Sequence, residues 1–457
     1  MTSPTDSTAA DLNRRDFLKG SSMASLMALL GGVPLIAPAR AAEAPAEAPS
    51  GDTVKCGVIG CGQWGREILN TLARLPSAEV VAVCDTYPVM VRRAREIAPK
   101  AEAYDDYTEL LANDAVQAVL IATPTHRHKD IVLAALKAGK HVYCEAPLAH
   151  TIEEARAIVR AAAAAATQYV QSGLLLRSDP QRRFLLDFIR AGAAGRTLRA
   201  TAQWQKKQSW RRSSPNAERE AELNWRLRRD TSTGLVGELG IHQLDVINWF
   251  LNRRPVAVTG FGSTILWQDG RDVPDTEHVV YELPGGALST FSGTLGNSFD
   301  GDYEMIYGSD AAVMLRGSKA WMFKEADAPL LGWEVYAHKD AFYKETGIAL
   351  VADATKLDAR GDNRAEPAPY TNTPLYYALE AFLYNADVTT HAVQDFTDTF
   401  GADDAKALAE HLAKESQNNL PAATAQDGFE ATVIALKGFE AVQKKARVEI
   451  DPALFAI

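Results

Sequence analysis

Cysteine is scarce in this sequence, with four residues among 457. All four lie between Cys56 and Cys144, and no two of them form a Cys-x-x-Cys pair. This spacing excludes a disulfide framework and a paired cysteine zinc site. Long basic tracts are also absent, and the net charge is −10. Because positive charge is what holds a phosphate backbone, we expect no nucleic-acid partner.

The composition is that of a globular protein, with 47% hydrophobic and 23% charged residues. At about 100 to 200 residues per domain, the length allows two or three domains with large cores. We therefore expect a fold that needs no disulfide or metal for stability, with the four cysteines buried as small apolar residues.

The first 41 residues resemble a twin-arginine export signal. Asn13-Arg14-Arg15-Asp16-Phe17-Leu18-Lys19 precedes an uncharged, mostly apolar run at 20–38, and Ala39-Arg40-Ala41 offers a small-x-small cleavage site. The alternative is a membrane anchor. Gly31, Gly32 and Pro34 interrupt the run, which falls short of the roughly 20 apolar residues of a spanning helix.

We therefore expect export through the twin-arginine machinery to the periplasm or beyond, cleavage after residue 41, and no stable membrane span. Residues 42–51 read as a linker. The pathway carries proteins that are already folded, which suits a protein that binds a cytoplasmic cofactor before it leaves the cell.

A glycine-rich loop follows the first candidate strand. Residues 53–60 are mostly apolar, the next residues are Gly60-Cys61-Gly62-Gln63-Trp64-Gly65, and a helical pattern resumes at Arg66. In such a loop the first glycine permits a tight turn, the second lets backbone approach a pyrophosphate, and the third lets helix pack on strand. The helix N-terminus attracts the phosphates. The predicted dinucleotide contacts in this loop are Gly60, Gly62, Gln63, Trp64 and Gly65.

The second candidate strand ends in Asp85, 20 residues beyond Gly65. A carboxylate there accepts hydrogen bonds from an adenosine ribose 2′-hydroxyl and repels a 2′-phosphate, so NAD is favoured over NADP. Arg92 and Arg93 on the following helix are the residues that would oppose this preference. The alternative interpretation is that Asp85 only caps that helix.

Strands and helices alternate as far as residue 173 and then give way to successive strands. The alternation predicts a Rossmann domain at 52–173 with a doubly wound parallel sheet. Residues 174–457 then form a substrate-binding and oligomerisation α+β domain with an open, mostly antiparallel sheet. The expected strands of that sheet are 197–205, 256–265, 278–283, 287–295 and 303–308.

The motifs together resemble the glucose-fructose oxidoreductase and inositol dehydrogenase family, known as Gfo/Idh/MocA. They are the glycine loop, Asp85, Thr123-Pro124 with His128 four residues on, and Ala138-Gly139-Lys140-His141-Val142 leading to Glu145-x-Pro147. The resemblance implies a sugar or polyol site bounded by the open sheet. It also implies that Thr123, Pro124 and Glu145 line the ribose and nicotinamide end, and it assigns His128 to the cofactor site.

One position departs from the family pattern. Most dehydrogenases of the family have Glu-Lys-Pro where this chain has Glu145-Ala146-Pro147, and the lysine normally helps to move the substrate hydroxyl proton. Alanine cannot do this. Either another group has taken over, with Lys206 and Lys207 as candidates, or the chemistry is not a plain dehydrogenation.

Residues 237–249 predict a helix with Glu238, His242 and Asp245 on one face. A carboxylate one turn from an imidazole orients it and raises its pKa, and histidine is the usual general base near neutral pH. The family places an acid and a histidine at this spacing beside the nicotinamide, so the predicted catalytic residues are His242, Glu238 and Glu145. The alternative is a helix-stabilising triad. Zinc is not expected, because the H-E-x-x-H order is absent.

Aromatic and basic residues flank this segment and suit a sugar, since an aromatic face covers a pyranose and guanidinium groups bind its hydroxyls. Alternatively, the tryptophans belong to the core. The predicted substrate-binding residues are Arg177, Trp210, Trp225, Arg226, Gln243 and Asp245. Residues 321–374 read as an insertion or lid-like excursion, and the open sheet face predicts a homo-oligomer.

Three functions fit these features. The first is an NAD(P)-dependent oxidoreductase that holds its cofactor tightly and acts on a sugar, polyol or glycoside, with His242 as acid and base. The second is a redox-neutral, NAD-dependent glycoside hydrolase. The third is a non-catalytic carbohydrate-binding accessory protein that keeps the fold.

Overall fold

The computed structural model describes residues 51–214, 216–331, 334, 339–342, 345–350, 371–401 and 404–457. The predicted export signal and all of the linker except Gly51 lie outside the described residues. Among the described residues, no helix combines the length and apolar character that crossing a membrane requires. All four cysteines are free and buried, as expected.

The first domain is built on a six-stranded sheet in the order β3-β2-β1-β4-β5-β6, with every pairing parallel. Its strands are β1 (Val54–Ile59), β2 (Ala78–Cys84), β3 (Glu102–Tyr104), β4 (Ala118–Ile121), β5 (His141–Cys144) and β6 (Val170–Ser172). The helices of this part of the chain are α3 (Gln63–Leu72), α4 (Pro88–Ile97), α5 (Tyr107–Leu111), α6 (His128–Lys137) and α7 (Ile152–Ala164).

The second sheet has ten strands in the order β14-β15-β13-β12-β11-β7-β10-β9-β8-β16, and only the β7–β10 pair is parallel. The central strands are β7 (Thr197–Gln205), β8 (Ala257–Ser263), β9 (Thr276–Glu282), β10 (Leu288–Thr294), β11 (Asp302–Gly308) and β12 (Ala311–Arg316). The outer strands are β13 (Lys319–Lys324), β14 (Lys339–Phe342), β15 (Glu345–Ala349) and β16 (Arg447–Glu449). A parallel Rossmann sheet followed by a mostly antiparallel sheet confirms the predicted fold class.

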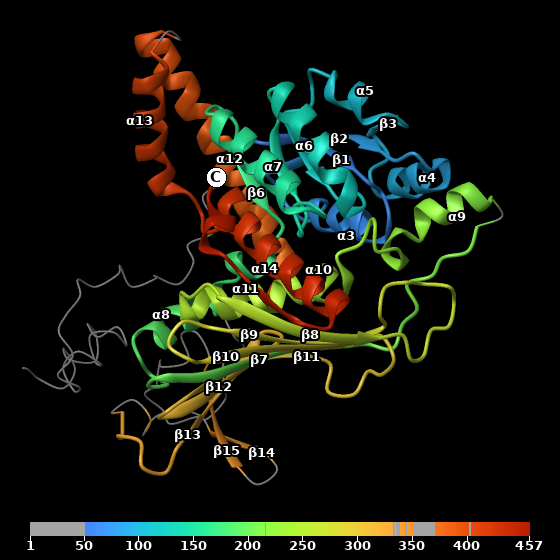
Figure 1. Ribbon diagram of the computed structural model, residues 1–457. Helices are drawn as coiled ribbons and strands as arrows, with labels where there is room; N and C mark the ends of the chain where they lie inside the picture. The colour runs from blue at the N-terminus through green and yellow to red at the C-terminus, as the bar shows by residue number, and fades with distance from the viewer. Residues whose placement is uncertain are drawn as a thin grey trace, which may run out of the picture.

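Helices of the second half fill the space between the two sheets and extend beyond it (Figure 1). They are α8 (Pro180–Arg190), α9 (Ala217–Leu223), α10 (Gly234–Glu238), α11 (Gly240–Leu251), α12 (Pro374–Phe400), α13 (Ala405–Glu415) and α14 (Ala425–Lys444). The short 3₁₀ helices are η1 (Thr125–Arg127), η2 (Leu175–Ser178), η3 (Trp225–Leu227), η5 (Ser416–Asn418) and η6 (Pro452–Phe455). Helix α14 packs on both α7 and β8, so it joins the two domains.

The location of two segments after residue 173 does not follow from their position in the sequence. Helix α12 contributes Leu379 and Phe382 to the same core as α3 and β1. Within the segment expected to be an insertion or lid, residues 321–324 belong to β13, and β14 and β15 extend the sheet at that edge. The rest of that segment lies mostly outside the described residues.

Candidate functional site

The glycine loop leaves open space where a pyrophosphate would lie. Gly60 has φ 93°, in the left-handed region that glycine tolerates. A Cβ on Gly65 would stand 1.8 Å from the Gly60 carbonyl oxygen, whereas a Cβ on Gly62 would meet nothing within 4 Å. Helix α3 begins there without a side-chain cap, so its first N–H groups remain available to an anion. The loop therefore fits a dinucleotide.

Asp85 ties the end of β2 to the glycine loop. Its carboxylate accepts hydrogen bonds from the backbone N–H groups of Cys61 and Tyr87, each at 2.8 Å. Burial raises the pKa of Asp85, and these two bonds oppose that rise. Asp85 thus holds the loop and also the start of α4, so it has a structural role in addition to the predicted ribose contact.

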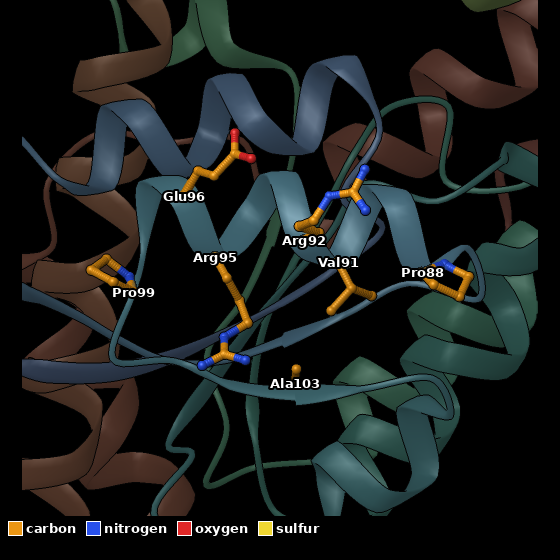
Figure 2. A pocket seen from close by; sticks show the side chains of 7 residues that line it. All are labelled: Pro88, Val91, Arg92, Arg95, Glu96, Pro99 and Ala103. Atoms are coloured by element: carbon orange, nitrogen blue, oxygen red, sulfur yellow. The ribbon is translucent and has the colours of Figure 1, made fainter.

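The arginine charges that act on Asp85 come from Arg219 and Arg66, and neither is one of those expected from α4. Arg92 lines a hollow of about 430 Å³ with Arg95 and Ala103, between α4 and β3 (Figure 2). Arg219 from α9 instead contacts Thr86, and its charge acts on Asp85. Arg219 was missed because it lies 133 residues from Thr86 in the sequence.

Two buried polar atoms, one after β4 and one after β5, have no hydrogen-bond partner among the described residues. Thr123 Oγ1 and Glu145 Oε1 are buried and make no hydrogen bond to the described residues. Burial raises the pKa of Glu145 to about 7, and contacts with Trp64 and Tyr143 partly offset this effect. Unpaired buried polar atoms are costly, so these two mark where a bound group would complete the structure.

His128, which was assigned to the cofactor site, contacts two backbone carbonyl groups. Its side chain is buried, with Nδ1 3.0 Å from the Pro147 carbonyl oxygen and Nε2 3.0 Å from that of Thr123. Because both partners are acceptors and a neutral imidazole has one N–H, His128 donates to one of these carbonyls and lies beside the other, and so links the two loops. Pro124 precedes η1 between these loops.

An apolar cluster lies beside Ala146, the position at which the family resemblance leads us to expect a lysine. Ala146 packs against Leu174, Ile241 and neighbouring alanines. This contact sets the turn after β5 against the start of α11. Lys206 and Lys207, the candidate replacements, are exposed, and their side chains make no hydrogen bond or ion pair to the described residues.

The single helix predicted over 237–249 is wrong, because the chain breaks at Leu239 (φ −128°, ψ −49°) into α10 and α11. Glycines at 237 and 240 weaken the helix. A Cβ on Gly240 would stand 2.7 Å from the Phe291 ring, so packing on β10 fixes this position. Glu238 and His242 consequently stand on different helices.

Glu238 is held by groups other than His242. Its buried carboxylate accepts hydrogen bonds from the Thr233 hydroxyl at 2.8 Å and the Thr125 hydroxyl at 3.4 Å, and Arg226 lies 3.4 Å away. Thr125 and Thr233 carried no signal in the sequence. The Thr125 bond joins the loop after β4 to the second domain across 113 residues.

The pKa of His242 was predicted to be raised, and in the structure it is lowered. Its Nδ1 is buried with no partner among the described residues, and burial lowers the pKa of His242 to about 4. The imidazole is therefore neutral near pH 7 and keeps a lone pair. Gln243, the next residue, also has a buried oxygen, Oε1, without a partner in the described structure.

The predicted substrate residues differ in their surroundings. Arg177 forms a double ion pair with Asp245 (2.9 and 2.8 Å) and a third contact to Asp427 at 2.7 Å, so these charges compensate one another. Arg226 lies over the buried Trp225 ring at 4.4 Å and reaches Glu238. Trp210 is partly buried against the core.

Trp225 also lines a cavity of about 630 Å³. His126, Asn224, Arg228 and Asp230 line it as well, and residues of α9 form part of its wall. His126 was not singled out in the sequence; it follows Thr125 in η1, and burial lowers its pKa to about 4. The cavity thus adjoins the loop that holds Glu238.

Two family models match the chain. The description of one is "Oxidoreductase family, NAD-binding Rossmann fold", over residues 54–173, and that of the other is "GFO/IDH/MocA C-terminal domain", over 183–314. Together they cover more than half of the chain.

Among curated proteins, an inositol 2-dehydrogenase from Rubrobacter xylanophilus is 31% identical over 52% of this chain and 64% of its own length. One from Burkholderia multivorans is 36% identical over 44% of this chain and 55% of its own. The match thus spans only about 55 to 64% of the length of these relatives.

Solved structures show the same fold. An oxidoreductase domain protein from Kribbella flavida has a TM-score of 0.64 at 21% identity, covering 88% of this chain and 100% of that one. Levoglucosan dehydrogenase in complex with NADH has a TM-score of 0.64 at 20% identity, with the same coverage.

Proposed function

The chain belongs to the GFO/IDH/MocA oxidoreductase family, and from this premise we propose that it is an NAD(P)-dependent oxidoreductase acting on a sugar, polyol or glycoside. The observation that carries the proposal is the junction of the two domains. The Thr125–Glu238 hydrogen bond, and the packing of Ala146 on the apolar cluster that contains Ile241, bring the ends of β4 and β5 against the segment that holds His242.

Different residues of the chain bind the two halves of the dinucleotide and transfer the proton. The open space at Gly62 and the uncapped start of α3 receive the pyrophosphate, and Asp85 receives the adenosine ribose. Thr123 and Glu145 offer unpaired oxygens to the other half of the dinucleotide. When bound, the dinucleotide supplies the acceptor for a hydride from a carbinol carbon.

His242 accepts the hydroxyl proton of the substrate at its imidazole as the hydride leaves. It suits this role because it is neutral near pH 7. Glu238 acts indirectly. It forms an ion pair with Arg226, whose guanidinium lies over the Trp225 ring, and these contacts hold Trp225 in place at the edge of the site. Gln243 offers an amide to a substrate hydroxyl.

The test is the variant His242→Asn, assayed for NADH or NADPH formation at 340 nm with inositols, anhydrosugars, aldoses and glycosides. We expect kcat to fall by about 10²- to 10⁴-fold while dinucleotide binding is retained, since only proton transfer is lost. In the wild type, the rate should fall as the pH drops through about 4 and His242 becomes protonated. His391→Asn, at a half-exposed site beside Asp52, serves as the control. An unchanged kcat in His242→Asn would exclude His242 as the base.

A second candidate is the redox-neutral hydrolysis of a glycoside, for which the bound dinucleotide would supply a reversible hydride acceptor. The apolar cluster beside Ala146 favours it, because the lysine expected for a plain dehydrogenation is missing and apolar side chains pack against the alanine in its place. Cleavage of a chromogenic glycoside that needs the dinucleotide but accumulates no reduced form would support this candidate over the first.

We also propose that the cofactor is NAD, bound tightly enough to accompany the protein through export. Protein purified without added nucleotide should release NAD(H) on denaturation, at close to one per chain by mass spectrometry. Absence of any nucleotide, together with no binding on titration, would contradict both enzymatic functions. It would leave a non-catalytic carbohydrate-binding accessory protein as the remaining interpretation.

A further inference from the structure

A segment of the second domain crosses to the first domain beside the nucleotide loop. The clamp segment, residues 206–224, leaves β7 and returns at η3, and it is described except at position 215. Its start is fixed to the second sheet, because Lys206 N–H donates to the Thr294 carbonyl at 3.1 Å. Asn224 closes its far end through two hydrogen bonds with the Arg212 backbone, at 2.7 and 2.8 Å.

Two arginines of the clamp segment contact the first domain at the two places where the dinucleotide would be held. Arg212 Nη2 lies 3.1 Å from the Gln63 side-chain oxygen, in the glycine loop. Arg219 donates to the Thr86 hydroxyl at 3.0 Å and to the Thr86 carbonyl at 2.6 Å. In Figure 1, α9 stands beside α4, on the side of the first domain where these contacts form.

Arg219 is held in place by more than Thr86. Its guanidinium lies 4.8 Å from the centre of the Tyr87 ring, and Glu222 pairs with it at 2.7 Å. The side chain is 21% exposed, and its positive charge reaches the Asp85 carboxylate. An arginine so positioned beside the acid that receives the adenosine ribose forms an outer wall for that end of the site.

We propose that the clamp segment retains the dinucleotide, with Arg212 beside the pyrophosphate and Arg219 on Tyr87 closing the adenosine end. This rests on the proposed dinucleotide-dependent function. A dinucleotide that extends from the glycine loop to Asp85 passes beneath the segment that joins Gln63 to Thr86. Release then requires both arginine contacts to break, and a cationic side chain near the pyrophosphate adds a charge-assisted interaction to that barrier.

The experiment measures the dissociation rate of NADH from the full-length protein. Protein loaded with NADH is mixed with excess NAD⁺ in a stopped-flow instrument, and the loss of NADH fluorescence is followed. Arg212→Ala and Arg219→Ala should each raise the dissociation rate by about 10- to 100-fold, and the double variant should exceed either. Tyr87→Leu, which leaves the clamp segment unchanged, should act in the same direction.

Arg254→Ala is the matched control. Arg254 also lies over an aromatic ring, Phe455 at 5.1 Å, and pairs with a glutamate, Glu430, but it belongs to neither the clamp segment nor the nucleotide loop. The rate at which NADH dissociates from the Arg254→Ala variant should stay within about twofold of the wild-type rate. Thermal unfolding of each variant without nucleotide separates a loss of fold from a loss of retention.

The outcomes separate this inference from the proposed function. If the wild type binds NADH and the folded double variant releases it at the wild-type rate, the clamp segment does not retain the dinucleotide. If the folded wild type binds neither NADH nor NADPH, the proposed function itself fails, and the inference fails with it.

Discussion

The two sheets of this protein bury their strands in different ways. In β4 of the first sheet, every residue is buried, and alternate side chains enter two separate cores. In β9 of the second sheet, buried and exposed residues alternate along the strand. The helices between the domains cover one face of that sheet, while Val280, Leu288 and Phe261 remain exposed (Figure 1). A strand that is buried on both faces has a continuous run of apolar residues in its sequence. In a strand that is buried on one face, apolar and polar residues alternate.

The largest expected effect lies in the first sheet. Leu120→Ala removes a fully buried side chain from one core, and Val119→Ala removes one from the core on the other face. We expect Leu120→Ala to lower the free energy of unfolding by about 2 to 5 kcal/mol. Val119→Ala should also destabilise measurably. Urea unfolding followed by circular dichroism measures both, and a neutral result at either position would contradict burial on two faces.

The covered face of the second sheet contains a carboxyl group that should respond to pH. Glu277 in β9 is fully buried, accepts the Val236 N–H at 2.9 Å, and has one oxygen without a partner among the described residues. Burial raises the pKa of Glu277 to about 8, above its ordinary value of 4.5. Its contribution to stability is therefore complete below about pH 4.5 and is lost as the pH rises through 8.

The variant Glu277→Gln should not lose stability as the pH rises through 8. Glutamine keeps an oxygen for the Val236 N–H and carries no charge, so the variant should gain stability over the wild type on the order of a few kcal/mol at pH 9. The gain should vanish near pH 4.5. Melting curves across this range give the comparison, and parallel pH profiles for the two proteins would rule out a buried, titrating Glu277.

The smallest effect belongs to the other face of the same strand. Val279 is 1% exposed and its neighbour Val280 is 38% exposed. Val279→Ala should destabilise by about 1 to 3 kcal/mol, while Val280→Thr should change stability by less than about 0.5 kcal/mol. Should Val280→Thr instead shift stability in a concentration-dependent way, the exposed face would be an interface between copies of the chain, as the predicted homo-oligomer requires.

Much of the first domain could be predicted because its signals are contiguous in the sequence. The Gly60 to Gly65 loop, Asp85 and the apolar runs of β4 and β5 each form within a few residues. The glycines are required by the backbone itself, since a Cβ at Gly65 would overlap the Gly60 carbonyl. The glycine loop and the acid at the end of β2 could therefore be located from the sequence, while the contacts of individual residues with a cofactor stay predictions. His128 is one of those residues, and its ring nitrogens lie 3.0 Å from two backbone carbonyl oxygens.

The second-domain part of the site was less predictable. Helical spacing placed Glu238 and His242 on one face, but two glycines and the Phe291 ring break the helix between them. Arg177 and Asp245 were expected at the substrate; in the structure they pair with each other, and Arg177 also pairs with Asp427. Residues three or four positions apart lie on one helix face only if the helix continues unbroken between them.

The sequence by itself determined the class of fold, the glycine loop and the acid at the end of β2, because backbone sterics and strand burial act over a few residues. The tertiary structure alone decided that Thr125 meets Glu238 and that Arg219 meets Thr86. These contacts join residues more than a hundred positions apart, so they form only when the two domains are packed together, as they are where α14 contacts both α7 and β8. A neutral His242 has the same origin, since burial between those domains, and not its neighbours in the sequence, lowers its pKa.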